Sequence, residues 1–122
     1  MQETTVQRKM TLCFLKSFYG EMLTEKEREA AELYLDEDLS LAEIAEQLQV
    51  TRQGVHDTLN RAFLKLEEYE RKLGLAERFD LIRSRMTRLG EALAKVTPTR
   101  ETQPEYEKAA LLLKELIEAE EQ

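Results

Sequence analysis

The chain has 122 residues and a formal net charge of −7, and 42% of its residues are hydrophobic while 35% are charged. This length is enough for one domain with a buried core, and the hydrophobic fraction argues against a disordered chain. No apolar run approaches the roughly 20 residues of a bilayer-crossing helix, and no signal-peptide core is seen at the N-terminus. With four glycines, two prolines and many helix-forming residues, the sequence predicts a cytoplasmic all-α protein without a membrane partner.

The acidic residues are concentrated in two segments. Residues 24–39 carry a net charge of −5 and residues 99–122 carry −4, whereas residues 75–98 carry +2. Between Gln49 and Lys65, three basic residues accompany one aspartate, which gives a local charge of +2. Because each neutralised phosphate adds to affinity for nucleic acid, this excess is small for a DNA-binding protein.

Two segments carry the capping-box pattern, in which a Ser or Thr and a Glu three residues later close a helix N-terminus. Thr24 with Glu27 predicts the start of one helix. Ser40 with Glu43 predicts the start of a short helix over residues 41–48. Two such boxes make these helix starts the most specific local signals in the chain.

Hydrophobic spacing predicts the helices on either side. A first helix is expected over residues 5–19, ending at Gly20. Its predicted apolar face consists of Val6, Met10, Cys13, Phe14 and Phe18. Thr51 is expected to cap a long helix. Gly54 occupies the position three residues later, where a capping box would have glutamate. That helix repeats apolar residues at heptad spacing: Val55, Leu59, Ala62, Leu66, Tyr69 and Leu73.

The heptad spacing continues in the second half of the chain. Gly74 is predicted to end the long helix, and the next one repeats Leu75, Phe79, Ile82, Met86, Leu89, Leu93 and Val96. A linker at 97–104 precedes a last helix at 105–120. We therefore predict a helix-turn-helix domain over residues 1–74 and a C-terminal helical extension over 75–122, packed as one compact unit. The seams can pair within one chain or between two chains as a homodimer.

Residues 41–61, "LAEIAEQLQVTRQGVHDTLNR", have the pattern of a helix-turn-helix. Ala45 is the small residue expected where the two helices cross. The residues expected in the core around it are Ile44, Leu48, Val50, Val55 and Leu59. Gln49 occupies the turn position where glycine is usual, at a cost of about 1 kcal/mol for a left-handed backbone. The fold class predicted is all-α and trihelical, winged-helix-like without a wing, with an additional N-terminal helix.

A recognition helix offers its exposed N-terminal residues to base edges. The candidate nucleic-acid-binding residues are Thr51, Arg52, Gln53, His56, Asp57, Asn60 and Arg61. Gln53 and Asn60 can pair with adenine, and Arg52 can pair with guanine or phosphate. Asp57 can accept from the cytosine amino group, but it repels phosphates unless it points into the groove.

The sequence from Leu23 to Leu66 is similar to the fourth region of bacterial sigma factors, whose helix-turn-helix reads promoter DNA. It resembles the YlxM family more fully, the small helix-turn-helix proteins encoded beside signal recognition particle genes. The shared segments are "FYG" at 18–20, "LT" at 23–24, "DLSLAEIAE" at 38–46, "VTRQGVHD" at 50–57 and "LEEYERKLGL" at 66–75. Gln49 in the turn and Gly54 in the reading helix depart from the helix-turn-helix pattern.

The YlxM resemblance implies an accessory or regulatory protein of the signal recognition particle pathway, which binds the particle's protein or RNA. The sigma resemblance implies the alternative, a transcriptional regulator that binds DNA. A complete sigma factor is not expected, because it needs a further domain for the upstream promoter element. A third interpretation is an adaptor whose helix-turn-helix binds another protein's helix.

Four arginines are close together in the predicted helix after Gly74: Arg78, Arg83, Arg85 and Arg88. One interpretation is contact with RNA phosphates or with an acidic partner protein. The other, which the usual behaviour of charged helix faces favours, is neutralisation of the acidic helices in the same molecule.

No residue pattern indicates catalysis, a metal or a cofactor. His56 is the single histidine, and neither a nucleophile nor an orienting group is close to it in sequence. The acidic run 36–38 lacks the spaced ligands and turn glycine of a calcium loop. Cys13 is predicted to pack and cannot form an internal disulfide. The aromatic residues Tyr34, Phe63 and Tyr69 are also predicted to pack in the core.

Overall fold

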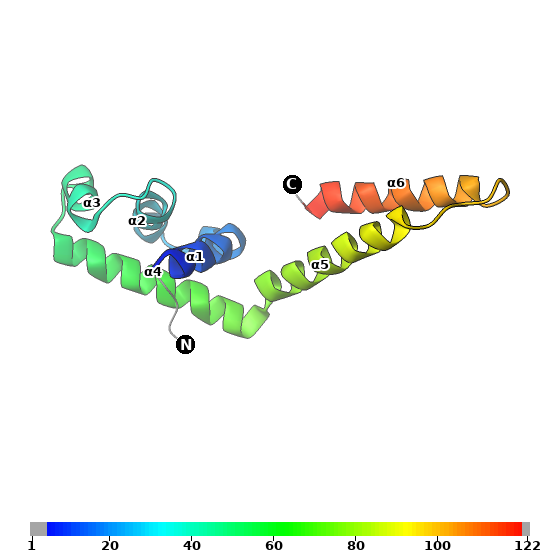
Figure 1. Ribbon diagram of the computed structural model, residues 1–122. Helices are drawn as coiled ribbons and strands as arrows, with labels where there is room; N and C mark the ends of the chain where they lie inside the picture. Colours follow the sequence, from blue (N-terminus) through cyan, green and yellow to red (C-terminus); the bar gives the residue numbers. More distant parts are fainter. Residues whose placement is uncertain (1–4, 121–122) are drawn as a thin grey trace. The chain divides into compact units, whose positions relative to one another are not determined.

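The computed structural model describes residues 5–120, and every element in that range is helical (Figure 1). The elements are α1 (Thr5–Tyr19), the 3-10 turn η1 (Gly20–Met22), α2 (Glu25–Leu35), α3 (Leu41–Leu48), α4 (Arg52–Leu73), α5 (Leu75–Ala94) and α6 (Gln103–Glu120). No helix in the described part of the chain is long and apolar enough to span a membrane. The all-α class predicted from the sequence is confirmed.

The chain divides into two compact units, of which the first ends at Ala76 and the second begins at Glu77. The predicted boundary after Gly74 lies two residues before this division. The expectation that both parts pack as one compact unit stays a prediction.

Both predicted capping boxes are present. Thr24 Oγ1 accepts from the Glu27 backbone N–H at 3.2 Å, and Glu27 Oε1 accepts from the Thr24 N–H at 2.9 Å. Ser40 and Glu43 form the same reciprocal pair, with distances of 3.1 and 3.0 Å. These bonds satisfy N–H groups that have no partner inside a helix, so they set where α2 and α3 begin.

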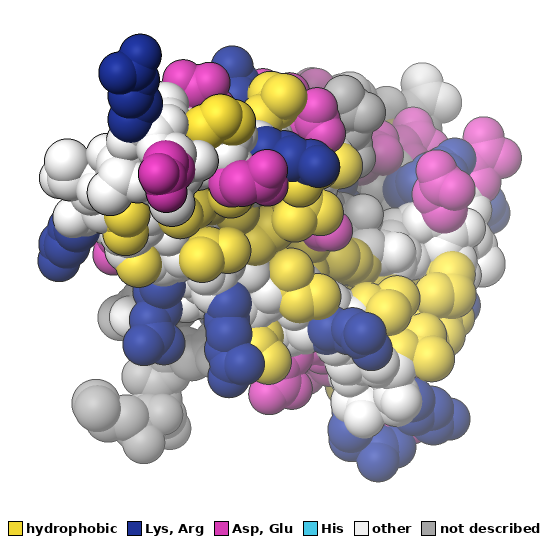
Figure 2. All heavy atoms as spheres, turned by 90° about the vertical axis from the view of Figure 1, so that its right-hand side faces the viewer, with side chains coloured by type: hydrophobic (Ala, Val, Ile, Leu, Met, Phe, Trp, Pro, Cys, Tyr) yellow, Lys and Arg dark blue, Asp and Glu magenta, His cyan; other side chains and the backbone are white. Residues whose placement is uncertain are grey.

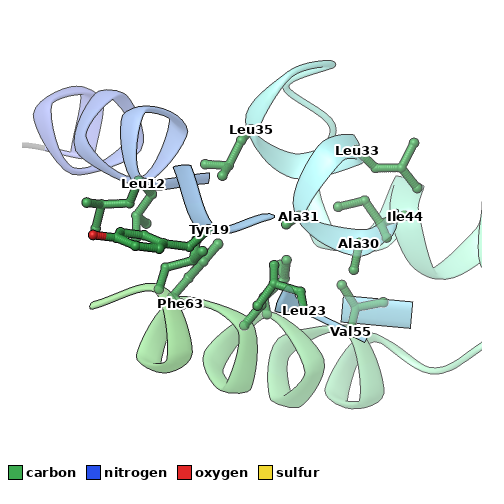
Figure 3. Packing of buried hydrophobic residues seen from close by; sticks show 14 of the residues in the cluster. Leu12, Tyr19, Leu23, Ala30, Ala31, Leu33, Leu35, Ile44, Val55 and Phe63 are labelled. Atoms are coloured by element: carbon green, nitrogen blue, oxygen red, sulfur yellow. The ribbon is translucent and has the colours of Figure 1, made fainter. Parts of the chain in front are cut away.

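The core of the first unit lies between α1, α2, α3 and α4 (Figure 3). Its largest fully buried side chains are Tyr19, Ile44, Val55 and Leu66. Phe63 is buried as predicted, and Tyr34 and Tyr69 pack against the core. The seam of α4 predicted from heptad spacing is buried from Val55 to Leu66, whereas Leu73 at its end is exposed.

The predicted apolar face of α1 is wrong in part. Val6 and Met10 are 67% and 66% exposed, and the buried residues of α1 are Leu12, Leu15 and Tyr19. The two sets lie on neighbouring faces of the helix, and each has the spacing of a helical stripe. Packing against α2 and α4 decides which of the two sets becomes buried. The spacing of residues within α1 does not indicate that choice.

A hydrogen-bond network joins the ends of α1 and α4. The buried Tyr19 hydroxyl donates to Glu70 Oε1 at 2.6 Å and accepts from the Leu75 N–H at 3.0 Å. Glu70 Oε1 also accepts from the Ala76 N–H at 3.0 Å. Gly74 has a φ of 63°, the left-handed cap predicted here, and its N–H donates to the Glu70 carbonyl. The turn after α4 is therefore fixed by α1 as well as by its glycine.

The second unit contains most of α5 and all of α6, which run antiparallel (Figure 1). Tyr106 Oη donates to the Leu93 carbonyl at 3.1 Å, and a Cβ built on Gly90 would lie 3.5 Å from Leu113 Cδ2. The helix predicted from 105 begins at Gln103, because Pro104 is tolerated in a first turn where its missing N–H has no intrahelical acceptor.

Candidate nucleic-acid interface

The helices α3 and α4 form the predicted helix-turn-helix. Gln49 has φ 58° and ψ 47°, so the turn takes the left-handed backbone expected at this position despite the absence of glycine. Thr51 Oγ1 caps α4 by accepting from the Gly54 N–H at 3.0 Å. A Cβ on Gly54 would lie 3.1 Å from that oxygen, which is tighter than an ordinary contact. Gly54 therefore leaves the cap room to form, although no glutamate completes a box.

The core beneath the motif follows the prediction except at Val50. Ile44, Ala45, Val55 and Leu59 are buried, and Leu48 is half-buried against the core. Val50 was expected to lie in the core but is 51% exposed. The left-handed residue before it redirects the chain, so that Val50 lies on the surface of the turn.

All seven predicted contact residues are exposed at the N-terminal end of α4. They are Thr51, Arg52, Gln53, His56, Asp57, Asn60 and Arg61. Three turns of one helix therefore bring these side chains onto a single end of the first unit, as a recognition helix requires.

Asp57 organises the polar side chains on this surface. Gln53 Nε2 donates to Asp57 Oδ1 at 2.9 Å, and His56 Nδ1 lies 3.7 Å from the same oxygen. Arg61 Nη2 donates to Thr58 Oγ1 at 3.3 Å. The Gln53 amide therefore has to leave Asp57 before it can pair with a base through both its donor and its acceptor.

A hollow of about 300 Å³ lies beside this surface, between α2, the α3–α4 turn and α4. It is lined by Lys26, Glu29, Ala30, Leu48, Val50, Gly54, Val55, Thr58 and Arg61. The sequence-based set includes Arg61 but misses Lys26 and Thr58 as candidate contacts. Lys26 lies on a different helix, so only the α2–α4 packing brings it next to the recognition helix.

An ion pair also joins α2 to α4. Lys65 Nζ donates to Glu27 Oε1 at 2.8 Å, and Glu27 is the one charged residue that is buried among residues 5–120. Burial alone would raise the pKa of Glu27, but hydrogen bonds from Lys65 and Thr24 outweigh it and leave the pKa lowered. Glu27, which completes the capping box of α2, therefore also holds the recognition helix α4 against α2.

The four arginines of α5 are exposed. Within the described part of the second unit, Arg78, Arg85 and Arg88 form no ion pair, so pairing with the acidic α6 is not seen for these three. Arg83 and Arg88 line a small hollow together with Asp80, Ser84 and Thr87. Arg78 and Arg85 are seven residues apart and share one line on the helix.

The remaining candidates have structural roles. Cys13 is half-buried, its thiol donates to the Leu35 carbonyl at 3.7 Å, and burial raises its pKa. In the acidic loop, Asp36 and Asp38 pair with Lys16 and Lys9 of α1 at 3.0 and 2.7 Å. Across residues 5–120, no group of three or more His, Cys, Asp or Glu side chains is placed to hold a metal ion.

A family model described as "putative helix-turn-helix protein, YlxM / p13 like" matches residues 6–107. The chain belongs to this family, UPF0122. A UPF0122 protein of Thermoanaerobacter sp. is 44% identical over 96 residues, which cover 79% of this chain and 80% of the relative. A UPF0122 protein of Desulforamulus reducens is 58% identical over 65 residues, 53% of this chain and 56% of the relative. One from Shouchella clausii is 42% identical over 89 residues, covering 73% and 82%.

The UPF0122 match extends from α1 through the helix-turn-helix and α5 into the first turns of α6. It therefore covers most of the first compact unit and the second unit as far as residue 107. The family resemblance inferred from the sequence is confirmed.

Proposed function

We propose that this chain is a non-enzymatic accessory protein of the signal recognition particle pathway in the cytoplasm, and that it binds the particle's protein or RNA through the surface of α4. The mixed charge of that surface carries the proposal: the Asp57 carboxylate lies among the exposed side chains and is close to both Gln53 and His56. A carboxylate there repels the dense phosphate array of duplex DNA. It suits a partner protein, or an RNA loop whose unstacked bases present hydrogen-bond donors away from a regular phosphate array.

The particle is suggested as the target by the likeness of this sequence to proteins encoded beside its genes. In this interaction Arg52 and Arg61 contact phosphate or carboxylate groups, since guanidinium binds both in bidentate geometry. The neighbouring hollow, with the exposed Val50 at its edge, accepts an apolar group of the partner.

The test is a salt titration of the full chain binding to the particle's RNA, to its GTPase and to random duplex DNA. We expect binding to a particle component at salt concentrations where duplex DNA has dissociated. Arg52→Ala and Arg61→Ala should each weaken that binding by about tenfold, the loss of one charged contact. Arg28→Ala is the matched control, an exposed arginine of α2. Binding to neither component, or equal binding to random DNA, would contradict the proposal.

A second candidate function is sequence-specific DNA binding by a transcriptional regulator. It is favoured by the geometry of the motif: a left-handed turn, a capped recognition helix and exposed Arg52, Gln53 and Asn60. Selection from a random DNA pool tests it. A regulator would enrich one consensus, and Arg52→Ala would abolish the enrichment, whereas a pool without a consensus would end this alternative.

A further inference from the structure

The second unit buries few apolar side chains. Met86 and Leu113 are its buried hydrophobic residues among those described. Its exposed large hydrophobic residues are Leu81, Ile82, Leu89, Val96, Leu111, Leu112 and Leu116. Because helices of this length depend on tertiary packing of an apolar face, two helices with so small a shared core need further cover. Figure 2 shows hydrophobic side chains open to solvent between basic and acidic ones.

The exposed residues of α5 and α6 follow a pattern. On α5, Phe79, Met86 and Leu93 share the covered side, and Ile82 and Leu89 lie on an adjacent exposed line. On α6, Tyr106, Leu113 and Ile117 share the covered side, and Leu112 and Leu116 lie on an adjacent exposed line. Each helix therefore has an apolar surface wider than the one that the other helix covers.

The two exposed lines lie on the same side of the hairpin. In both helices the exposed line is offset from the covered side in the same rotational sense about the helix axis, as the spacing of 3.6 residues per turn requires. Since α5 and α6 run antiparallel, equal offsets point to one side. We call the surface formed by Ile82, Leu89, Leu112 and Leu116 the hairpin face.

The charges beside the hairpin face are complementary between its two helices. Helix α5 contains four arginines and three acidic residues, whereas α6 contains five glutamates and two lysines. Tyr106 bonds to Leu93 and Leu113 lies beside Gly90, and continuing this antiparallel register puts Arg85 and Glu115 at the same level. Both side chains are exposed, next to the hairpin face.

We propose that the hairpin face binds the hairpin face of a second copy of this chain, giving a four-helix bundle in which α5 of one chain lies over α6 of the other. A second copy is the occupant that matches both the apolar area and the charges, because a two-fold axis parallel to the helices brings basic α5 against acidic α6 twice. Rotation about this axis does not change a residue's position along the bundle. Arg85 therefore lies opposite the partner's Glu115, which is at the same height along the helices. The proposal is independent of which molecule α4 binds.

Sedimentation equilibrium of the full chain tests the proposal. We expect twice the 14.3 kDa mass of one chain. The double substitution Leu112→Glu, Leu116→Glu should raise the dissociation constant by at least about 100-fold, because it places charges in an apolar interface. Leu111→Glu is the matched control on the same helix but off the hairpin face, with 55% exposure against 52% and 55% for the other two. It should remain a dimer.

A charge swap tests the same interface if the leucine variant fails to fold, which loss of its helical circular dichroism would show. Arg85→Glu and Glu115→Arg each place like charges together in a homodimer, whereas a mixture restores both pairs. Native mass spectrometry should then find mixed dimers above the random share. The control Arg83→Glu, on the opposite flank of α5 from the hairpin face, should show no such preference with Glu115→Arg.

Any one of three results would overturn the proposal. The first is a wild-type chain that stays at the mass of one chain at every concentration. The second is a folded Leu112→Glu, Leu116→Glu variant that dissociates no more than Leu111→Glu does. The third is a charge swap that gives no excess of mixed dimers.

Discussion

The two compact units use similar helices but bury them to different extents. The first unit has a core in which Tyr19, Ile44, Val55 and Leu66 are almost fully enclosed, whereas the second buries Met86 and Leu113 among its described residues. Both have apolar residues at helical spacing. The difference teaches that spacing predicts a helix and its apolar side, while the number of packed neighbours decides how much of that side is enclosed.

The largest expected effect comes from the core of the first unit. Leu66→Ala should lower the free energy of unfolding by about 2–5 kcal/mol, because it leaves a cavity in a region that cannot collapse around it. The exposed Leu111→Ala in the second unit should change it by less than about 0.5 kcal/mol. Urea denaturation of both variants measures this contrast, and equal losses would remove the distinction between the units.

A hydroxyl deletion compares a buried network with a half-buried one. Tyr19→Phe should cost about 1–3 kcal/mol, since it removes the donor to Glu70 and the acceptor of the Leu75 N–H inside the protein. Tyr106→Phe removes one bond to the Leu93 carbonyl, which water can replace. Thermal unfolding should therefore show the larger drop for Tyr19→Phe, and the reverse order would contradict the assigned burial.

Removal of a cap should have a smaller effect. Thr24→Ala should cost about 1 kcal/mol because the Glu27 N–H loses its acceptor at the start of α2. The control Thr87→Ala replaces an exposed residue inside α5 with a better helix former, so it should leave stability equal or slightly higher. Chemical denaturation compares the two, and a Thr24→Ala variant as stable as the wild type would show that the box contributes nothing.

Acid should destabilise the first unit through the buried carboxylate of Glu27. The pKa of Glu27 is lowered from its ordinary 4.5, so the folded state holds its charged form more strongly than the unfolded chain does. Its contribution is therefore present above about pH 4.5 and is lost as the pH falls through the folded pKa. Stability measured against pH should fall less steeply in Glu27→Gln. An unchanged slope would exclude Glu27 as a source of the acid sensitivity.

Local chemistry made much of the fold predictable. The boxes at Thr24 and Ser40, the cap at Thr51 and the left-handed residues Gln49 and Gly74 depend on neighbours within a few residues. Their positions therefore followed from short sequence patterns. The exposure of Arg52, Gln53 and Asn60 followed as well, because the recognition helix turns its other side to the core.

Features that depend on distant contacts were not predictable in the same way. Val6 and Met10 lie on the exposed side of α1 because α2 and α4 pack on its neighbouring face. Lys26 reaches the hollow beside α4 only through the packing of α2. The heptad seam of α5 is divided, with Met86 covered by α6 and Leu89 exposed, and no spacing within one helix distinguishes these two positions.

Native-state hydrogen exchange of the full chain at several concentrations tests most directly the claim that the two units are stabilised by different contacts. Amide protons of α4 should exchange at one slow rate at every concentration, because their core lies within one chain. Amide protons of α5 after Ala76 and of α6 should become more protected as concentration rises, because a second chain completes their core. Protection of α6 equal to that of α4 in dilute solution, without change on concentration, would contradict the account.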